Sequence, residues 1–207
     1  MVQEEKWIKH YCNKHEILLV GEGDFSFAAS LATAFGSAVN ITATSLDTEE
    51  TLEWKYPTGA AANLRLLKEK RCTIIHGVDA CTMTNHHLLS HRRFDRIVFN
   101  FPHAGFPAFE HHTFQIELHR GVVRGFMRSA SEMMREKGEV HVTHKTSHPY
   151  FRWDIAGVGK EEGFLLLEQA NFVITDYPGY QNKRGSGTNS NQSFPVGDCS
   201  TYKFVLK

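Results

Sequence analysis

The sequence lacks the features that mark membrane-bound, secreted and disulfide-linked proteins. Its longest apolar runs, such as residues 17–20 and 164–167, are far shorter than the ~20 residues that a membrane-spanning helix needs. Residues 1–7 are charged and contain no apolar segment of the kind that a secretory signal requires. The four cysteines lie far apart and form no C-x-x-C pair, which favours reduced thiols. We therefore expect a protein that is neither secreted nor attached to a membrane.

The sequence also lacks an excess of charge of either sign. Lys and Arg together number 23, as do Asp and Glu, so the formal net charge is zero. No general basic field can hold a nucleic acid, and RNA binding would need a local basic patch or a protein partner that supplies affinity. The hydrophobic fraction of 41% and the charged fraction of 22% exclude disordered, collagen-like and coiled-coil proteins. Without a repeat or a linker, the 207 residues predict one domain over 1–207.

Strand-like and helix-like segments alternate along the chain. Strands are predicted at residues 14–20, 39–46, 72–77, 94–100, 139–143, 164–170 and 200–206. Helices are predicted at residues 26–35, at 48–71 with an interruption at 56–59, at 110–137 and at 153–162. This α/β order predicts a single doubly wound, mostly parallel, seven-stranded Rossmann-like sheet. The last two strands are joined by the polar loop 176–197, so we expect them to form an antiparallel hairpin.

Unusual residues follow four of these strands at the point where each strand ends. In an open parallel sheet, ligands bind at the carboxyl ends of the strands, next to the point where strand order reverses. Gly21, Glu22, Gly23 and Asp24 follow the first strand, where glycines permit a tight turn and a helix with Ser26 as its N-cap offers free N–H groups. Asp24 would repel a pyrophosphate but suits a cofactor with an ammonium group. The alternative is a tight strand–helix turn without a ligand.

Acidic and amide side chains follow the next three strands. Asp47 comes about 24 residues after Gly23, where a carboxylate usually accepts hydrogen bonds from ribose hydroxyls, and its alternative role is a helix N-cap. Asp79 could accept a hydrogen bond from an adenine amine or cap the short helix that follows. Asn100 precedes Pro102 at the end of the fourth strand, and its oxygen could accept from the N–H donor of a base edge. The alternative for Asn100 is a strand-terminating turn.

Several of these segments together resemble a known family. The most distinctive are Gly21-Glu-Gly-Asp-Phe-Ser-Phe27 and Asn100-Phe-Pro-His103, accompanied by segments 76–80, 138–145 and 176–185. In order, and over essentially the whole chain, the sequence is similar to the eukaryotic large-subunit rRNA uridine-N3 methyltransferase-like family. The resemblance implies a Rossmann-like class I methyltransferase that uses S-adenosylmethionine and acts on RNA, foremost on uracil N3 of rRNA. It implies a nuclear or nucleolar location, and a cytoplasmic one stays open.

The same resemblance implies which residues bind the cofactor. The methionine side would lie against the first loop, with Gly21, Gly23, Asp24 and Phe25. Asp47 would bind the ribose and Asp79 the adenine.

The tetrapeptide Asn100-Phe101-Pro102-His103 would face the target base. In related amino-methylating enzymes it reads Asn/Asp-Pro-Pro-aromatic, so Phe101 and His103 are departures that fit a ring N–H better than an exocyclic amine. Asn100 would hold the base through its O4 or N3–H edge. His103 would stack on the base or accept the N3 proton, because imidazole titrates near neutral pH. The alternative for His103 is a surface histidine in a Pro-rich turn.

Two further groups of residues could contact RNA. Tyr180, Lys183 and Arg184 lie in the loop 176–197, and flexible basic tips with aromatics suit single-stranded targets. The second group lies at near-helical spacing and either contacts phosphates or forms a solvated helix face. It consists of His119, Arg120, Arg124 and Arg128.

The sequence predicts no metal site, and it leaves other functions open. His141 and His144 would point to opposite faces of a strand, which argues against a shared metal ion. A catalytically inactive nucleotide- or RNA-binding module has the same fold, and a methyltransferase of a small molecule or protein would fit the neutral charge. A nicotinamide-dependent oxidoreductase is disfavoured by the missing third glycine and by Asp24.

Overall fold

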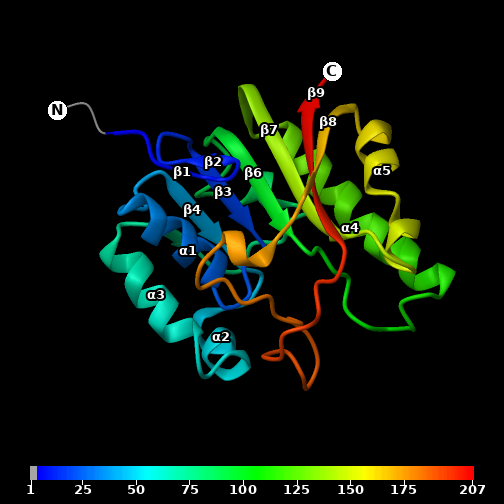
Figure 1. Ribbon diagram of the computed structural model, residues 1–207, viewed down its shortest axis with the longest axis horizontal. Coiled ribbons are helices and arrows are strands. Elements are labelled where there is room, and N and C mark those ends of the chain that lie inside the picture. Colours follow the sequence, from blue (N-terminus) through cyan, green and yellow to red (C-terminus); the bar gives the residue numbers. More distant parts are fainter. Residues whose placement is uncertain (1–3) are drawn as a thin grey trace.

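The computed structural model describes residues 4–207 and has a seven-stranded sheet at its centre (Figure 1). The strands lie in the order β5-β4-β3-β6-β7-β9-β8. Their bounds are β3 Ile17–Val20, β4 Ile41–Thr44, β5 Thr73–Ile75, β6 Phe94–Asn100, β7 Met134–Lys145, β8 Phe164–Asn171 and β9 Cys199–Leu206. Strands β3 to β7 pair in parallel, whereas β9 is antiparallel to both β7 and β8. The predicted α/β fold with a terminal antiparallel pair is confirmed.

Helices cover both faces of this sheet (Figure 1). One face carries α1 Ser26–Phe35, α2 Glu49–Lys55 and α3 Ala60–Glu69. The other face carries α4 Thr113–Ser131 and α5 Ile155–Glu161. Short 3-10 helices complete the structure at η1 Met83–Asn85, η2 Tyr150–Trp153 and η3 Ile174–Asp176. No helix within residues 4–207 has both the length and the hydropathy needed to cross a membrane.

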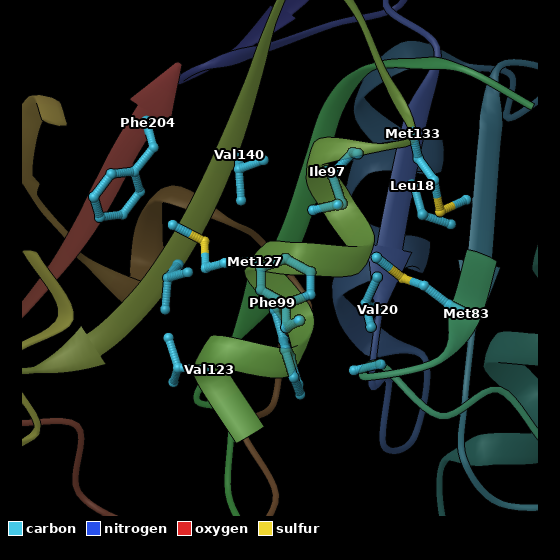
Figure 2. Close-up of a cluster of buried hydrophobic side chains, with 14 of the residues drawn as sticks. Leu18, Val20, Met83, Ile97, Phe99, Val123, Met127, Met133, Val140 and Phe204 are labelled. Carbon is cyan, nitrogen blue, oxygen red and sulfur yellow. The ribbon is translucent and has the colours of Figure 1, made fainter. Parts of the chain in front are cut away.

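The apolar runs of β3 and β6 are buried on both faces of the sheet, as central parallel strands require. Leu18 and Ile97 pack toward α4, together with Val123 and Met127 of that helix, as Figure 2 shows. Leu19 points to the opposite face, where it belongs to the cluster beneath α1 and α3. Because close-packed interiors are stiff, the loops that follow β3 and β6 start from fixed positions.

Two differences from the sequence-based prediction have clear physical reasons. The N-terminal hairpin of β1 Trp7–Ile8 and β2 Tyr11–Cys12 was not predicted, because two-residue strands are too short to show a period. The helix predicted at 110–137 ends at Ser131. Met133 is buried and its carbonyl accepts a hydrogen bond from Phe94 at 2.9 Å, so the chain enters the sheet at this point and β7 follows at once.

Candidate active site

The carboxyl ends of β3, β4 and β6 surround a cavity of about 200 Å³, which we call the first cavity. It lies where β3 separates β4 from β6, which is the reversal point of strand order. Most of the predicted site residues line it, namely Gly21, Gly23, Asp24, Asp47, Asn100, Phe101, His103, Tyr180, Lys183 and Arg184. Polar residues at three of the four strand ends singled out in the sequence therefore meet at this cavity, whereas Asp79 after β5 does not line it.

The loop after β3 depends on its first glycine. Gly21 has a φ of 67°, and a side chain there would clash with the ring of Phe99 on β6. Phe25 is the N-cap of α1, with a φ of 62°, and its ring is buried in the core. The prediction that Ser26 caps this helix is wrong, because Ser26 is the first residue inside the helix and its Oγ accepts the Gln181 N–H at 3.0 Å instead of a helix N–H.

Glu22 also lines the first cavity, although the sequence analysis assigned it no role. Its carboxyl group accepts the N–H of Ala28 at 3.1 Å. The sequence analysis expected free N–H groups at the start of this helix, and this one is already occupied. The side chain is only 8% exposed, and burial raises the pKa of Glu22 to about 8, although the Ala28 hydrogen bond acts in the opposite direction. A cationic ligand in the first cavity would favour the ionised form of this carboxyl.

The two predicted nucleoside carboxylates lie in different settings. Asp47 lines the first cavity and forms an ion pair with Lys55, whose Nζ lies 2.7 and 2.9 Å from the two carboxylate oxygens. The N-cap of α2 is Thr48, which accepts the Thr51 N–H, so Asp47 is not used as a cap. Asp79 is exposed, lies outside the lining of this cavity, and accepts a hydrogen bond from Cys81 N–H at 2.8 Å.

Asn100 at the end of β6 carries a buried polar atom without a partner. Its Oδ1 accepts no hydrogen bond from any residue between 4 and 207. The next residue, Phe101, has a φ of 51°, which turns the chain sharply, and its N–H donates to Thr143 O at 2.8 Å. Leaving a buried carbonyl oxygen unpaired costs about 1–3 kcal/mol, which a donor on a ligand would recover. This oxygen is therefore the strongest sign of a ligand in the first cavity.

A second cavity of about 290 Å³ adjoins the first. The two share Phe101, His103, Lys183 and Arg184 as lining residues. Aromatic rings dominate the rest of the second cavity, contributed by Phe106, Tyr150, Trp153 and Phe194. Pro102 also lines it. A flat ring system is the kind of ligand that such walls bind by stacking.

His103 stands between the cavities in a hydrogen-bonded group that sequence reasoning missed. Its Nδ1 accepts the Gly105 N–H at 3.0 Å, so its Nε2 carries a proton and donates to Glu110 at 2.8 Å. His119 Nε2 lies 3.2 Å from the other Glu110 oxygen. Burial raises the pKa of Glu110, but the hydrogen bonds from both histidines outweigh it and bring this pKa to about 2.

These three side chains have potential metal-ligand atoms within 4.8 Å of one another. The hydrogen bonds give them a different function. Because the Nε2 of His103 holds a proton that faces Glu110, it has no lone pair for a metal. Glu110 instead fixes the ring of His103 in one tautomer and one orientation.

The loop 176–197 folds over the first cavity instead of extending as a flexible tip. Tyr180 packs edge-on against Phe27, with ring centres 5.1 Å apart. Lys183 Nζ lies 3.8 Å from Asp24 Oδ2 and donates to Asn191 O at 3.1 Å. The loop is the orange segment beside α2 in Figure 1. Lys183 and Tyr180 are thus tied into the protein, whereas Arg184 remains exposed.

The sequence matches a known protein family. Residues 18–184 match the family model described as BMT5-like, rRNA (uridine-N3-)-methyltransferase BTM5-like. The chain belongs to the BMT5-like family. The predicted family resemblance is confirmed.

Relatives of this BMT5-like chain differ in length. An uncharacterized protein of Arabidopsis thaliana is 54% identical over 204 residues, which cover 97% of both chains. The Heavy metal-associated isoprenylated plant protein 41 of the same plant is 49% identical over 97% of this chain, which spans only 39% of that relative. The 25S rRNA (uridine(2634)-N(3))-methyltransferase of Saccharomyces cerevisiae is 23% identical over 85% of this chain and 67% of its own.

Solved structures confirm the methyltransferase fold of the BMT5-like chain. The Glycopeptide N-methyltransferase MtfA complexed with sinefungin has a TM-score of 0.55 at 14% identity, over 92% of this chain and 80% of that one. The ribosomal protein L11 methylase of Lactobacillus delbrueckii has a TM-score of 0.52 at 13% identity, over 93% and 70%. At sequence identities this low, the similarity shows a shared fold and nothing about function.

The remaining predicted residues of this BMT5-like protein lie away from the cavities or inside the core. His119 is fully buried, so its prediction as part of an exposed helix stripe is wrong. The arginines of that stripe form ion pairs with α5 instead of offering free charges to phosphates. These pairs join Arg120 and Arg124 to Glu161, and Arg124 and Arg128 to Glu162.

The two histidines of β7 point to opposite faces, as predicted. His141 contacts the hydroxyl of Tyr11 on one face. His144 packs against Trp153 on the other, with ring centres 4.1 Å apart. They therefore cannot share one metal ion.

Proposed function

We propose that the protein transfers a methyl group from S-adenosylmethionine to N3 of a uridine in large-subunit rRNA. The observation that carries this proposal is the unpaired, buried Oδ1 of Asn100 in the first cavity, next to an adjoining aromatic cavity, in a chain of the BMT5-like family. The yeast relative is named for uridine N3 of 25S rRNA, and the proposal extends this specificity to the present chain.

The residues of the first cavity fit a methyl donor that is both a nucleoside and a cation. Gly21 and Gly23 both line this cavity, and because neither residue has a side chain, the Phe99 ring and the Tyr56 hydroxyl can pack closely against the turn. Asp47 would accept the ribose hydroxyls once Lys55 shifts from its carboxylate. Glu22 offers a carboxyl that ionises more readily beside a positive charge. When bound, S-adenosylmethionine supplies an activated methyl group on a sulfonium centre.

Asp79 is the residue proposed to bind the adenine. Asp79 follows β5, yet its carboxylate is exposed and already accepts the Cys81 N–H. It would need to turn toward the first cavity to accept from an adenine amine. Phe25 contributes indirectly, because its buried ring and left-handed backbone set the direction of the loop.

Residues at the junction of the two cavities would hold the base, with Asn100 on the side of the first cavity and Phe101 and His103 lining both. Asn100 Oδ1 would accept the N3–H of uracil and thereby orient the ring. Phe101 and Pro102 would form the floor between the cavities. Both ring nitrogens of His103 are already engaged, so of its two proposed roles the geometry favours stacking over proton acceptance. Proximity and orientation supply much of the acceleration of an in-line displacement.

RNA outside the base would be bound by local charge. Arg184 is exposed at the rim shared by both cavities, and Lys183 lies beside it against Asp24. With zero net charge, the protein would draw the rest of its RNA affinity from a partner protein. A nuclear or nucleolar location follows from the rRNA substrate and belongs to the same proposal.

Methyl transfer by the purified protein tests this function. Labelled S-adenosylmethionine and unmodified large-subunit rRNA should give labelled 3-methyluridine after digestion and nucleoside mass spectrometry. Asn100→Ala should abolish transfer but leave the Kd of S-adenosylmethionine within about twofold, because its side chain is assigned to the base. Asp47→Ala should abolish micromolar cofactor binding.

The outcomes separate the competing functions. Cofactor binding without transfer to any RNA would indicate a binding module. Label on a protein or a small molecule would indicate another substrate class, and a large loss of cofactor affinity in Asn100→Ala would refute the assignment of Asn100. Lys203→Met serves as the control, because Lys203 on β9 pairs with Glu168 on the edge strand β8 and lines neither cavity.

A further inference from the structure

Lys145 is a cation on the wall of the second cavity, and it has no role in the proposed function. It is the last residue of β7, and its side chain lines the cavity together with Tyr150 and Phe194. The Nζ atom lies 4.7 Å from the ring centre of Tyr150 and 5.0 Å from that of Phe194. Within residues 4–207, Lys145 forms no ion pair with a carboxylate, unlike Lys55 and Lys183 of the neighbouring cavity.

The groups around Lys145 leave its charge uncompensated. Cys199 is opposite it on β9, and burial raises the pKa of that thiol to about 11, so the thiol is neutral. Burial lowers the pKa of Lys145, and Arg184 on the loop, a second cation, acts in the same direction, whereas Cys199 and Glu110 act against it. Glu110 is the nearby carboxylate, and its two oxygens are occupied by His103 and His119. The second cavity therefore offers a positive charge between aromatic walls.

We propose that Lys145 donates a hydrogen bond to a carbonyl oxygen of the target uracil and stabilises the anion that forms when N3 loses its proton. The inference rests on the proposed function and names its specificity residue. Uracil N3 has no free lone pair until its N–H bond breaks and the proton passes to water. The negative charge then spreads over N3 and both carbonyl oxygens, where an ammonium group binds it strongly.

The remaining step balances without any other reactant. The N3 electron pair forms the new bond to the methyl carbon while the bond from that carbon to sulfur breaks, which leaves a neutral thioether and a neutral N3-methyluracil. Lys145 stays protonated throughout. A base that is methylated on an exocyclic amine forms no such anion, so Lys145 would favour a ring imide over an amine.

Three variants test this role. Lys145→Met removes the charge but keeps the length of the side chain, Lys145→Arg keeps the charge, and Lys203→Met is a matched control away from both cavities. Transfer rates are measured with RNA that carries uridine or 5-fluorouridine at the target, because fluorine makes the N3–H more acidic. Fluorine NMR of the bound 5-fluorouridine, recorded without methyl donor, reports the pKa of N3 directly.

The proposal predicts a specific pattern. Lys145→Met should lose on the order of 10²-fold in rate on uridine, as enzymes do when they lose one donor to a developing anion, and recover most of it on 5-fluorouridine. The N3 pKa of the bound base should be lower in the wild-type protein than in Lys145→Met, and Lys145→Arg should stay within about tenfold of the wild-type rate.

Other patterns overturn it. Equal losses on both substrates, or an unchanged N3 pKa, would show that Lys145 acts only in packing. An inactive Lys145→Arg beside an active wild-type protein would show that Lys145 is a proton acceptor instead. If the wild-type protein methylates no uridine, the proposed function fails as a whole. Melting temperatures of the three variants show whether any loss comes from unfolding.

Discussion

Replacement of Glu22 by glutamine provides a quantitative test of the first cavity. The ordinary pKa of this carboxyl is 4.5, and burial in the folded protein raises it to about 8. Between these values, the folded protein holds a proton that the unfolded chain has released. The stability that is present below pH 4.5 therefore decreases as the pH rises toward 8, by up to about 1.4 kcal/mol per pH unit. Glutamine stays neutral over this range and can still accept the Ala28 N–H.

The difference between the two proteins is large enough to measure. From pH 5.5 to 7.5, the free energy of unfolding of the wild-type protein should decrease by about 3 kcal/mol more than that of Glu22→Gln. Urea denaturation at pH 5.5, 6.5 and 7.5 gives these free energies. Parallel pH dependences in both proteins would refute the assignment, because they would show that the Glu22 carboxyl ionises in the folded state as it does in water.

Three other changes follow from the same structure. Gly21→Ala should lower the free energy of unfolding by about 2–4 kcal/mol, because the methyl group meets the Phe99 ring at a positive φ, and unchanged denaturation midpoints would contradict this. Glu110→Gln should make the free energy of unfolding less dependent on pH in acid. The depressed pKa of Glu110 stabilises the wild-type protein above pH 4.5, and this stability is lost as the pH falls toward 2. In an acid titration, the free energy of unfolding of the variant should therefore decrease less steeply than that of the wild-type protein. Lys183→Ala should loosen the loop over the first cavity by removing its contact with Asp24, so limited proteolysis should cut residues 182–192 several-fold faster, and an unchanged rate would argue against this contact.

The fold could be predicted because its signals are local. The apolar run Ile17–Val20 predicts a strand buried on both faces, and β3 has this environment. The same reasoning placed Gly21, Asp47 and Asn100 at strand ends, and the parallel sheet brings these ends together. The end of α4 was harder to predict from the sequence, because it depends on a hydrogen bond between Met133 and Phe94, which are far apart in the sequence.

Only part of the second cavity could be predicted: Phe101, Pro102 and His103 were assigned to the substrate, but its other walls carry no periodic signal. Glu110 lies in an irregular segment after β6, and only the folded chain shows that it joins two histidines. Lys145 lies beyond the predicted strand 139–143, and no sequence signal assigned it a role. Tyr180 and Lys183 were placed in a flexible loop on the basis of composition, whereas tertiary contacts with Phe27 and Asp24 decide their position. Sequence patterns show which strand ends carry polar groups, but not which loops fold back onto them.

Nucleoside mass spectrometry of large-subunit rRNA from cells that lack this protein tests the central claim most directly. We predict that 3-methyluridine is lost at one site, and that a wild-type gene restores it whereas an Asn100→Ala gene does not. Unchanged 3-methyluridine in those cells would contradict the claim that the two adjoining cavities form a uridine-N3 methylation site for rRNA.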